Sequence, residues 1–90
     1  MLQRIQVIYK GNVQGVGFRY TARSVAQRYS VSGFVKNLTN GDVEVTAEGH
    51  QAQVEQFVAD LEREMQGYVD SRTVEWGAPT GEFRGFTVRF

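Results

Sequence analysis

The sequence of 90 residues has no cysteine, and only one proline and one histidine. Without cysteine the chain cannot form disulfides, thiolate metal sites or a cysteine nucleophile. The lack of cysteine also fits a reducing compartment, and we expect a cytoplasmic protein. The lone histidine, His50, has no neighbouring cluster of metal-binding residues, so we expect no bound metal ion.

Long apolar runs are missing as well. No stretch approaches the length of a membrane-spanning helix. Met1 is not followed by the apolar region of a secretory signal. We therefore expect no membrane partner. A chain of 90 residues has room for one small core, which predicts a single domain over residues 1–90.

Acidic residues are absent from the first 41 positions, which hold six basic residues. From Asp42 onward all ten acids appear, against four arginines. The net charge of zero therefore hides a basic first part and an acidic second part. The basic excess surrounds a glycine-rich loop, where it would raise the local concentration of an anionic substrate. Two solvated faces of opposite charge are the alternative explanation.

The glycine-rich loop runs Gly11-Asn12-Val13-Gln14-Gly15-Val16-Gly17-Phe18-Arg19 and joins a strand-like segment to a helix-like one. Glycines let backbone amides turn inward, and the first turn of a helix has N–H groups without helical partners. We predict a cradle for a phosphate-sized anion. Its members are the amides of Gln14, Gly15, Val16, Gly17 and Phe18, and the guanidinium of Arg19. The loop lacks the endings of the Walker and Rossmann motifs, and a plain tight turn is the alternative.

Hydrophobic periodicity predicts the elements on either side of this loop. Alternating apolar residues indicate strands at 5–10, 31–38, 43–48, 72–76 and 86–90. Helical spacing indicates helices at 18–29 and 54–65, with 77–85 as a loop. Asn40-Gly41 predicts a hairpin turn with a positive φ at both residues. In the strand at 43–48, apolar residues alternate with Glu44, Thr46 and Glu48, which predicts one solvent-exposed face. Gly49-His50 breaks this alternation.

The resulting order is β-α-β-β-α-β with one short extra strand at the end. Two helices of this size cover only one face of the sheet, so we predict an α+β, ferredoxin-like sandwich with a mainly antiparallel sheet. In that topology the first two strands run parallel with the third between them. The end of the second strand then lies about 10 Å from the loop after the first. We expect Asn37 to converge on whatever the loop binds.

Individual polar residues allow more than one interpretation. Arg19 stands in a first helical turn, where a cation is disfavoured unless an anion is bound nearby. Asn37 is disfavoured within a strand, and either marks the strand end or holds a water through its amide. Arg23 is expected on a solvated helix face. Glu62 and Glu64 point to different parts of a helix and are expected to be solvated.

Two motifs resemble those of the acylphosphatase family. The first is the loop from Gly11 to Arg19, and the second is Gly33-Phe34-Val35-Lys36-Asn37. The segments Asn40-Gly41-Asp42-Val43-Glu44 and Glu48-Gly49 also fit that family, and the similarity extends over essentially the whole chain.

The resemblance implies a ferredoxin-like fold and hydrolysis of small acyl phosphates to carboxylate and inorganic phosphate, without metal or organic cofactor. It implies that Arg19 and the loop amides bind the phosphate, and that Asn37 positions the attacking water. An acyl phosphate is a mixed anhydride, so its carboxylate leaves without a strong general acid. Phosphoryl transfer then needs mainly positioning and charge stabilisation. The proton of the water is expected to pass to a phosphate oxygen of the substrate.

The sequence also allows two other functions. A non-catalytic module that binds phosphate or acyl phosphate would look the same except that it has no use for Asn37. An RNA-binding sheet of the same topology would stack bases on exposed aromatics. The expected central strands lack the aromatic sequence motif of such RNA-binding sheets, and the strand at 43–48 exposes acidic residues. We therefore expect no nucleic-acid partner. We also expect a monomer.

Overall fold

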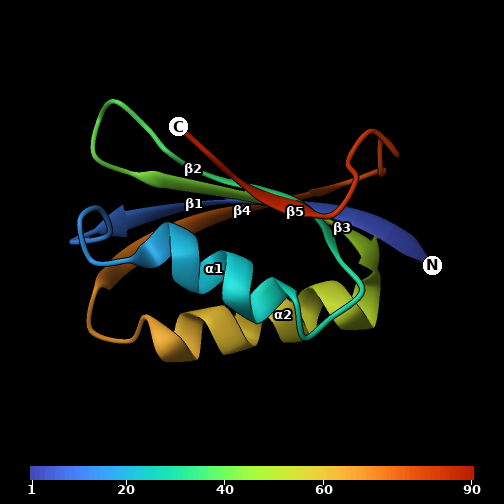
Figure 1. Ribbon diagram of the computed structural model, residues 1–90, viewed down its shortest axis with the longest axis horizontal. Helices are drawn as coiled ribbons and strands as arrows, with labels where there is room; N and C mark the ends of the chain where they lie inside the picture. Colours follow the sequence, from blue (N-terminus) through green and yellow to red (C-terminus); the bar gives the residue numbers. More distant parts are fainter.

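The computed structural model describes residues 1–90 and contains one five-stranded sheet with both helices on one face (Figure 1). The strand order is β4-β1-β3-β2-β5. The elements are β1 (Leu2–Gly11), α1 (Phe18–Ala26), β2 (Ser32–Asn37), β3 (Val43–His50), α2 (Gln51–Glu64), β4 (Val69–Gly77) and β5 (Phe86–Arg89). The predicted ferredoxin-like fold is therefore confirmed. Neither helix has the length and apolar character needed to cross a membrane.

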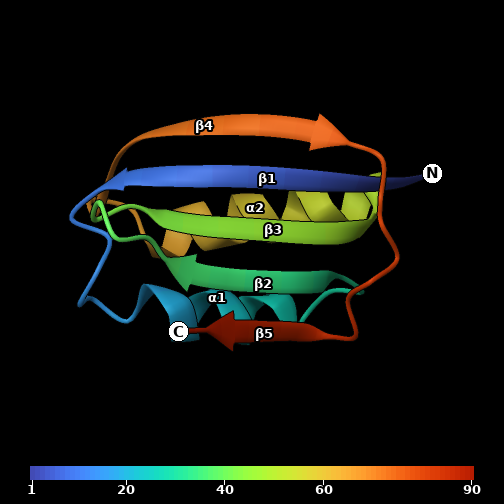
Figure 2. The ribbon, with the colours of Figure 1, turned by 90° about the horizontal axis from the view of Figure 1, so that it is seen from above.

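The sheet brings the ends of β1 and β2 level with each other. Both strands pair antiparallel with β3, and Tyr9 on β1 and Asn37 on β2 lie on either side of Val43. The two outer strands of this trio thus run in the same direction, as Figure 2 shows from above. The loop that follows β1 emerges at the edge where β2 ends, which is the convergence that the sequence predicts.

A single apolar core fills the space between the sheet and the helices. The inward residues of β1 and β3 meet the buried stripes of α1 and α2. Tyr9 joins this core to the start of α1, because its ring centre lies 5.2 Å from that of Phe18. The Tyr9 hydroxyl donates to Glu62 at 3.0 Å. Burial, and then the neighbouring Glu62 carboxylate, raise the pKa of the Tyr9 phenol far above its usual range, so this hydroxyl remains a donor.

Several element ends differ from the sequence expectation. Helix α1 stops at Ala26, and residues 27–30 continue in tighter turns such as Tyr29 N–H to the Ala26 carbonyl at 3.1 Å. Strand β3 continues through His50, because pairing with β1 overrides the local break at Gly49. Strand β4 begins earlier than expected, at Val69, and β5 ends at Arg89.

The hairpin turn between β2 and β3 also differs. Gly41 has a φ of 97°, but no residue other than glycine has a positive φ, so the expectation for Asn40 is wrong. The Asn40 side chain instead accepts a hydrogen bond from the Asp42 amide at 3.0 Å, and in this local turn only Gly41, not Asn40, has a positive φ. The turn bond runs from the Gly41 amide to the Leu38 carbonyl at 3.2 Å.

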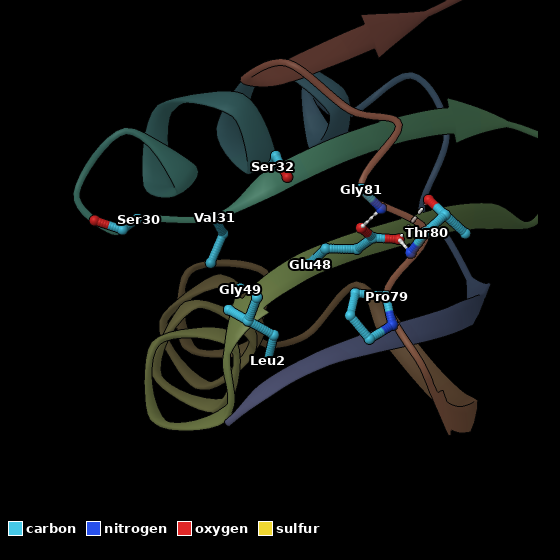
Figure 3. A pocket seen from close by; sticks show the side chains of 9 residues that line it. All are labelled: Leu2, Ser30, Val31, Ser32, Glu48, Gly49, Pro79, Thr80 and Gly81. Carbon is cyan, nitrogen blue, oxygen red and sulfur yellow. Dashed lines mark hydrogen bonds between the residues drawn. The ribbon is translucent and has the colours of Figure 1, made fainter.

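The face of β3 away from the helices was predicted to be exposed to solvent, but it is largely buried. Thr46 and Glu48 are only 2% and 5% exposed. The connection between β4 and β5 folds over this face, and Glu48 accepts hydrogen bonds from the Thr80 amide at 2.8 Å and the Gly81 amide at 3.0 Å (Figure 3). Burial alone would raise the pKa of the Glu48 carboxyl. The hydrogen bonds from Thr80 and Gly81 outweigh burial and hold that pKa below its usual value.

Candidate active site

The loop between β1 and α1 owes its shape to two glycines. Gly15 and Gly17 have φ values of 77° and 78°, and Val16 between them has an ordinary negative φ. A side chain in this left-handed region costs about 1–2 kcal/mol. A Cβ atom at Gly15 or Gly17 would meet nothing within 4 Å, so the backbone conformation and not lack of room requires glycine.

The backbone amides of this loop are free of internal partners. None of the amides from Gln14 to Phe18 donates a hydrogen bond to another protein group, and the first bond of α1 runs from the Thr21 amide to the Gly17 carbonyl at 3.0 Å. No side chain caps the helix at Gly17. Unpaired amides at a helix start attract anions through both hydrogen bonding and the helix dipole. The loop therefore has the chemistry of the predicted anion cradle.

The loop borders a small hollow of about 220 Å³. Its lining residues are Val13, Gly15, Gly17, Phe18, Arg19, Tyr20 and Asn37. The volume is below the about 300–1,000 Å³ typical of sites for larger ligands, and suits a group of phosphate size with an attached water. The hollow brings Arg19 from α1 together with Asn37 from the end of β2, although the two residues are far apart in sequence.

Arg19 is held by strand β5. Its guanidinium donates to the Arg89 carbonyl at 3.3 Å and lies 4.6 Å from the centre of the Phe90 ring. None of the ion pairs in the structure involves Arg19. Its positive charge is thus oriented but not neutralised, which is the state needed to bind an anion.

Asn37 is the last residue of β2 and is half-buried. Its side-chain amide makes no hydrogen bond with another protein group, whereas the Asn40 amide nearby is engaged with Asp42 at 3.1 Å. A free amide can donate to one group and accept from another. Asn37 can therefore hold a water or a substrate oxygen at the edge of the hollow.

Comparison with known proteins assigns this chain to a family. The family model described as Acylphosphatase matches residues 5–88. The chain belongs to the acylphosphatase family. It is 40% identical to an acylphosphatase of Roseiflexus sp. (strain RS-1) over 88 residues, covering 97% of this chain and 95% of the relative. It is also 40% identical to an acylphosphatase of Anaeromyxobacter sp. (strain Fw109-5) over 89 residues, covering 98% and 96%.

The similarity extends to three dimensions. The crystal structure of acylphosphatase from Bacillus subtilis superposes with a TM-score of 0.88 at 32% identity, and the match covers 100% of both chains. The family resemblance expected from the two sequence motifs is therefore confirmed. In this chain the last strand, β5, pairs parallel with β2, and the Arg89 carbonyl at its end reaches Arg19.

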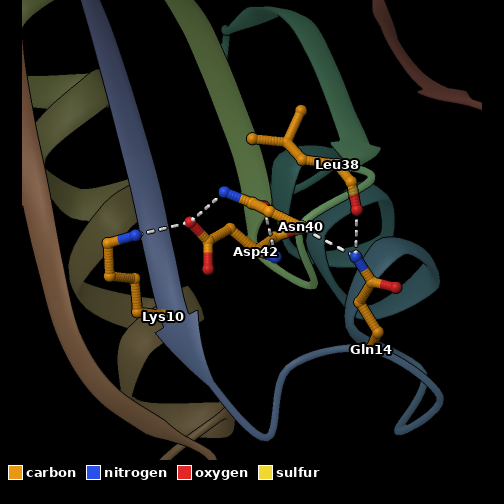
Figure 4. Close-up of polar contacts among 5 residues, drawn as sticks. All are labelled: Lys10, Gln14, Leu38, Asn40 and Asp42. Atoms are coloured by element: carbon orange, nitrogen blue, oxygen red, sulfur yellow. Dashed lines mark hydrogen bonds and ion pairs between the residues drawn. The ribbon is translucent and has the colours of Figure 1, made fainter.

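Two predicted members of the anion cradle do not line the hollow with their side chains. Val16 packs against the core. The Gln14 side chain turns away to the hairpin between β2 and β3, where its Nε2 donates to the Leu38 carbonyl at 2.7 Å and to the Asp42 carbonyl at 2.9 Å (Figure 4). Only the amides of Gln14 and Val16 are thus available to a phosphate. No local pattern in the sequence pairs residue 14 with residue 38, so the sequence does not predict this contact.

The other candidate residues lie outside the hollow beside Arg19. His50 is exposed at the opposite end of β3. Glu62 contacts Tyr9 and Arg72, and Glu64 pairs with Arg28 at 2.9 Å, so these two acids do not form an acid–base pair. No group of three or more His, Cys, Asp or Glu side chains is arranged to hold a metal ion.

A larger hollow of about 520 Å³ lies where β1 begins and β3 ends, away from the loop. Its lining includes the Glu48 carboxylate together with Ser30 and Pro79 (Figure 3). A carboxylate with a lowered pKa repels a phosphate. The smaller hollow beside Arg19 is therefore the better candidate for binding a phosphate.

Proposed function

We propose that this protein hydrolyses the carboxyl–phosphate bond of small acyl phosphates and releases a carboxylate and inorganic phosphate. The observation that supports this activity best is the shared hollow, which the free-amide loop, Arg19 and Asn37 all border. Family membership supports the same reaction. The catalytic residues in this proposal are Arg19 and Asn37.

In the proposed mechanism, the phosphoryl group of the substrate binds to the amides of Gln14 to Phe18 and to the Arg19 guanidinium. These donors stabilise charge on the equatorial oxygens, where it concentrates in the transition state. The Asn37 amide holds a water in line with the bond to the acyl oxygen. The water oxygen bonds to phosphorus while the bond from phosphorus to the acyl oxygen breaks.

The remaining steps need no strong acid or base. The electron pair of the broken bond stays with the leaving carboxylate, which is a weak base. The amide of Asn37 is too weak a base to take the proton of the attacking water. That proton passes to an oxygen of the phosphoryl group, so the products are a carboxylate and inorganic phosphate. This scheme assigns no role to a metal ion or an organic cofactor.

The alternative function is binding of phosphate or acyl phosphate without hydrolysis. Asn37 favours hydrolysis, because a pure binder has no use for an unengaged amide beside the cradle. We further infer a cytoplasmic, monomeric protein whose single domain spans residues 1–90. The lack of cysteine supports the reducing location, and the single core cluster supports the single domain.

The purified protein should be mixed with benzoyl phosphate, with and without a chelator, while loss of the acyl phosphate and release of inorganic phosphate are measured. We expect catalytic turnover that persists in the chelator and is inhibited by added inorganic phosphate. Binding of phosphate without turnover would favour the alternative function. Turnover that disappears in the chelator and returns with added metal would contradict the metal-independent mechanism.

A further inference from the structure

We propose that the side chain of Gln14 is a positioning residue, which fixes Asn37 relative to the phosphate loop. This inference rests on the proposed role of Asn37 and adds a residue that does not line the hollow. The sequence gives Gln14 a place in the cradle only through its backbone amide. Its side chain has a separate structural connection to the strand that carries Asn37.

The Gln14 side chain bridges the two sides of the hairpin turn between β2 and β3. Its single nitrogen donates to carbonyls on both sides of the turn, Leu38 at 2.7 Å and Asp42 at 2.9 Å. Both hydrogens of Nε2 are used, and an amide oxygen in this place would repel two carbonyl oxygens. Leu38 directly follows Asn37, so the bond from Gln14 acts one residue away from the proposed water-positioning amide.

A second connection joins the hairpin between β2 and β3 to the end of β1 (Figure 4). Lys10, just before the loop, pairs with Asp42 at 2.6 Å. Asp42 is buried and also accepts from the Asn40 amide at 3.1 Å. The hairpin is thus tied to β1 before the loop and to the loop itself at Gln14. Together with the pairing of both strands to β3, these two connections hold the hairpin in register with the loop.

This coupling matters for catalysis because the phosphate and the water are held by different segments. The phosphate binds to the loop after β1, and the water binds to the end of β2, with Val43 of β3 between the two strand ends. A misplacement of reacting groups by about 1 Å can lower the rate about 100-fold. Loss of the Gln14 bonds would free Leu38 and Asn37 to shift, while the loop glycines would keep the cradle in shape.

Gln14→Met tests this inference, because methionine has a similar length and no donor. The two carbonyls keep backbone partners, since the Gly41 amide donates to Leu38 at 3.2 Å and the Leu38 amide donates to Asp42 at 2.8 Å. We therefore expect a folded variant. Its kcat for benzoyl phosphate should fall about 10- to 100-fold, with the inhibition constant of inorganic phosphate little changed. Gln56→Met on the exposed face of α2 is the matched control and should retain full kcat.

A double-mutant cycle shows whether Gln14 acts through Asn37. In the Asn37→Ala background, Gln14→Met should lower kcat by less than about threefold, because the group it positions is already absent. Multiplicative losses in the double variant, or a loss of phosphate affinity as large as the loss of kcat, would overturn the inference. If Gln14→Met does not fold, Gln14→Ala is measured in the same cycle. Full activity of Asn37→Ala alone would instead reject the proposed function on which the inference rests.

Discussion

The guanidinium of Arg19 lies 4.6 Å from the centre of the Phe90 ring. The same side chain donates to the carbonyl of Arg89, so the end of the chain after β4 orients a residue near the start of α1. A ring face attracts a cation but does not neutralise it as a carboxylate would. Arg19 is therefore set in position with its charge still available to an anion in the hollow.

Replacement of Arg19 by glutamine should remove both phosphate binding and turnover. Arg19→Gln keeps a polar side chain but loses the charge and the fork of donors. We expect kcat for benzoyl phosphate to fall at least about 100- to 1,000-fold, with most of the inhibition by inorganic phosphate lost. Arg23→Gln, one helical turn later, is the matched control and should stay within about twofold of the parent protein. Near-normal turnover of Arg19→Gln would remove Arg19 from the mechanism.

Replacement of Asn37 should separate catalysis from binding. Asn37→Ala removes the unengaged amide at the edge of the hollow but leaves the loop amides and Arg19 in place. We expect kcat to fall about 100-fold or more, while inorganic phosphate inhibits as well as before. Steady-state rates measured over a series of phosphate concentrations give both quantities. A variant that retains kcat, or that loses phosphate affinity and kcat together, would contradict the assigned role.

The loop glycines give a prediction about backbone strain. In Gly15→Ala the new Cβ meets no neighbour, so the only penalty is that of the left-handed conformation. The loop amides have no internal partners, and the loop can relax in the unliganded protein. Phosphate must then restore the strained conformation, which should weaken its binding about tenfold.

Gly67→Ala is the matched control for this prediction. Gly67 has a φ of 94° and equally open surroundings, but it follows α2 away from the hollow. We expect this variant to lose about 1–2 kcal/mol of unfolding free energy and to keep normal phosphate affinity. Equal phosphate affinities in the two alanine variants would mean that the loop conformation does not matter for binding.

Glu48 predicts how stability depends on pH. Its pKa is lower in the folded protein than in the unfolded chain, so ionised Glu48 stabilises the fold above its ordinary pKa of 4.5. That contribution is lost as the pH falls below this value, through the folded pKa. Glu48→Gln should lower the unfolding free energy at pH 7 by about 1–3 kcal/mol.

Urea denaturation of both proteins at pH 7 and under acid conditions measures this contribution. The difference between the parent and Glu48→Gln should shrink as the pH falls, because the parent protein protonates its own Glu48. Glu55→Gln, on the exposed face of α2, should show no such difference at either pH. A difference for Glu48→Gln that stays constant down to the acid range would show that its charge is not the source of stability.

Local patterns in the sequence were sufficient to predict the type and order of the elements and the end of the sheet where Arg19 and Asn37 meet, but they left the position of β5 open. Alternation and helical spacing depend on which face of each element is buried, and that face is set by the core. The position of Asn37 close to the loop follows from topology alone, because β1 and β2 both pair with β3. Gly15 and Gly17 both have a positive φ, and glycine is the residue that adopts this conformation most readily, so the sequence alone indicates the shape of the loop.

Features that depend on long-range contacts could not be predicted in this way. Alternation correctly directed Glu48 away from the core, but only the fold shows that Thr80 and Gly81 cover it. The side chain of Gln14 is a similar case, since its partners Leu38 and Asp42 have no periodic relation to it. In both cases a polar side chain is engaged by backbone groups from a distant segment.

The unpaired amides of the loop also link the product to the folding equilibrium. In the proposed site, these amides would gain partners from inorganic phosphate, and the unfolded chain offers no equivalent arrangement. At about 100 times its dissociation constant, such a ligand stabilises the native state by about 2.7 kcal/mol. If the proposed site binds its product, phosphate that inhibits turnover should also raise the free energy of unfolding.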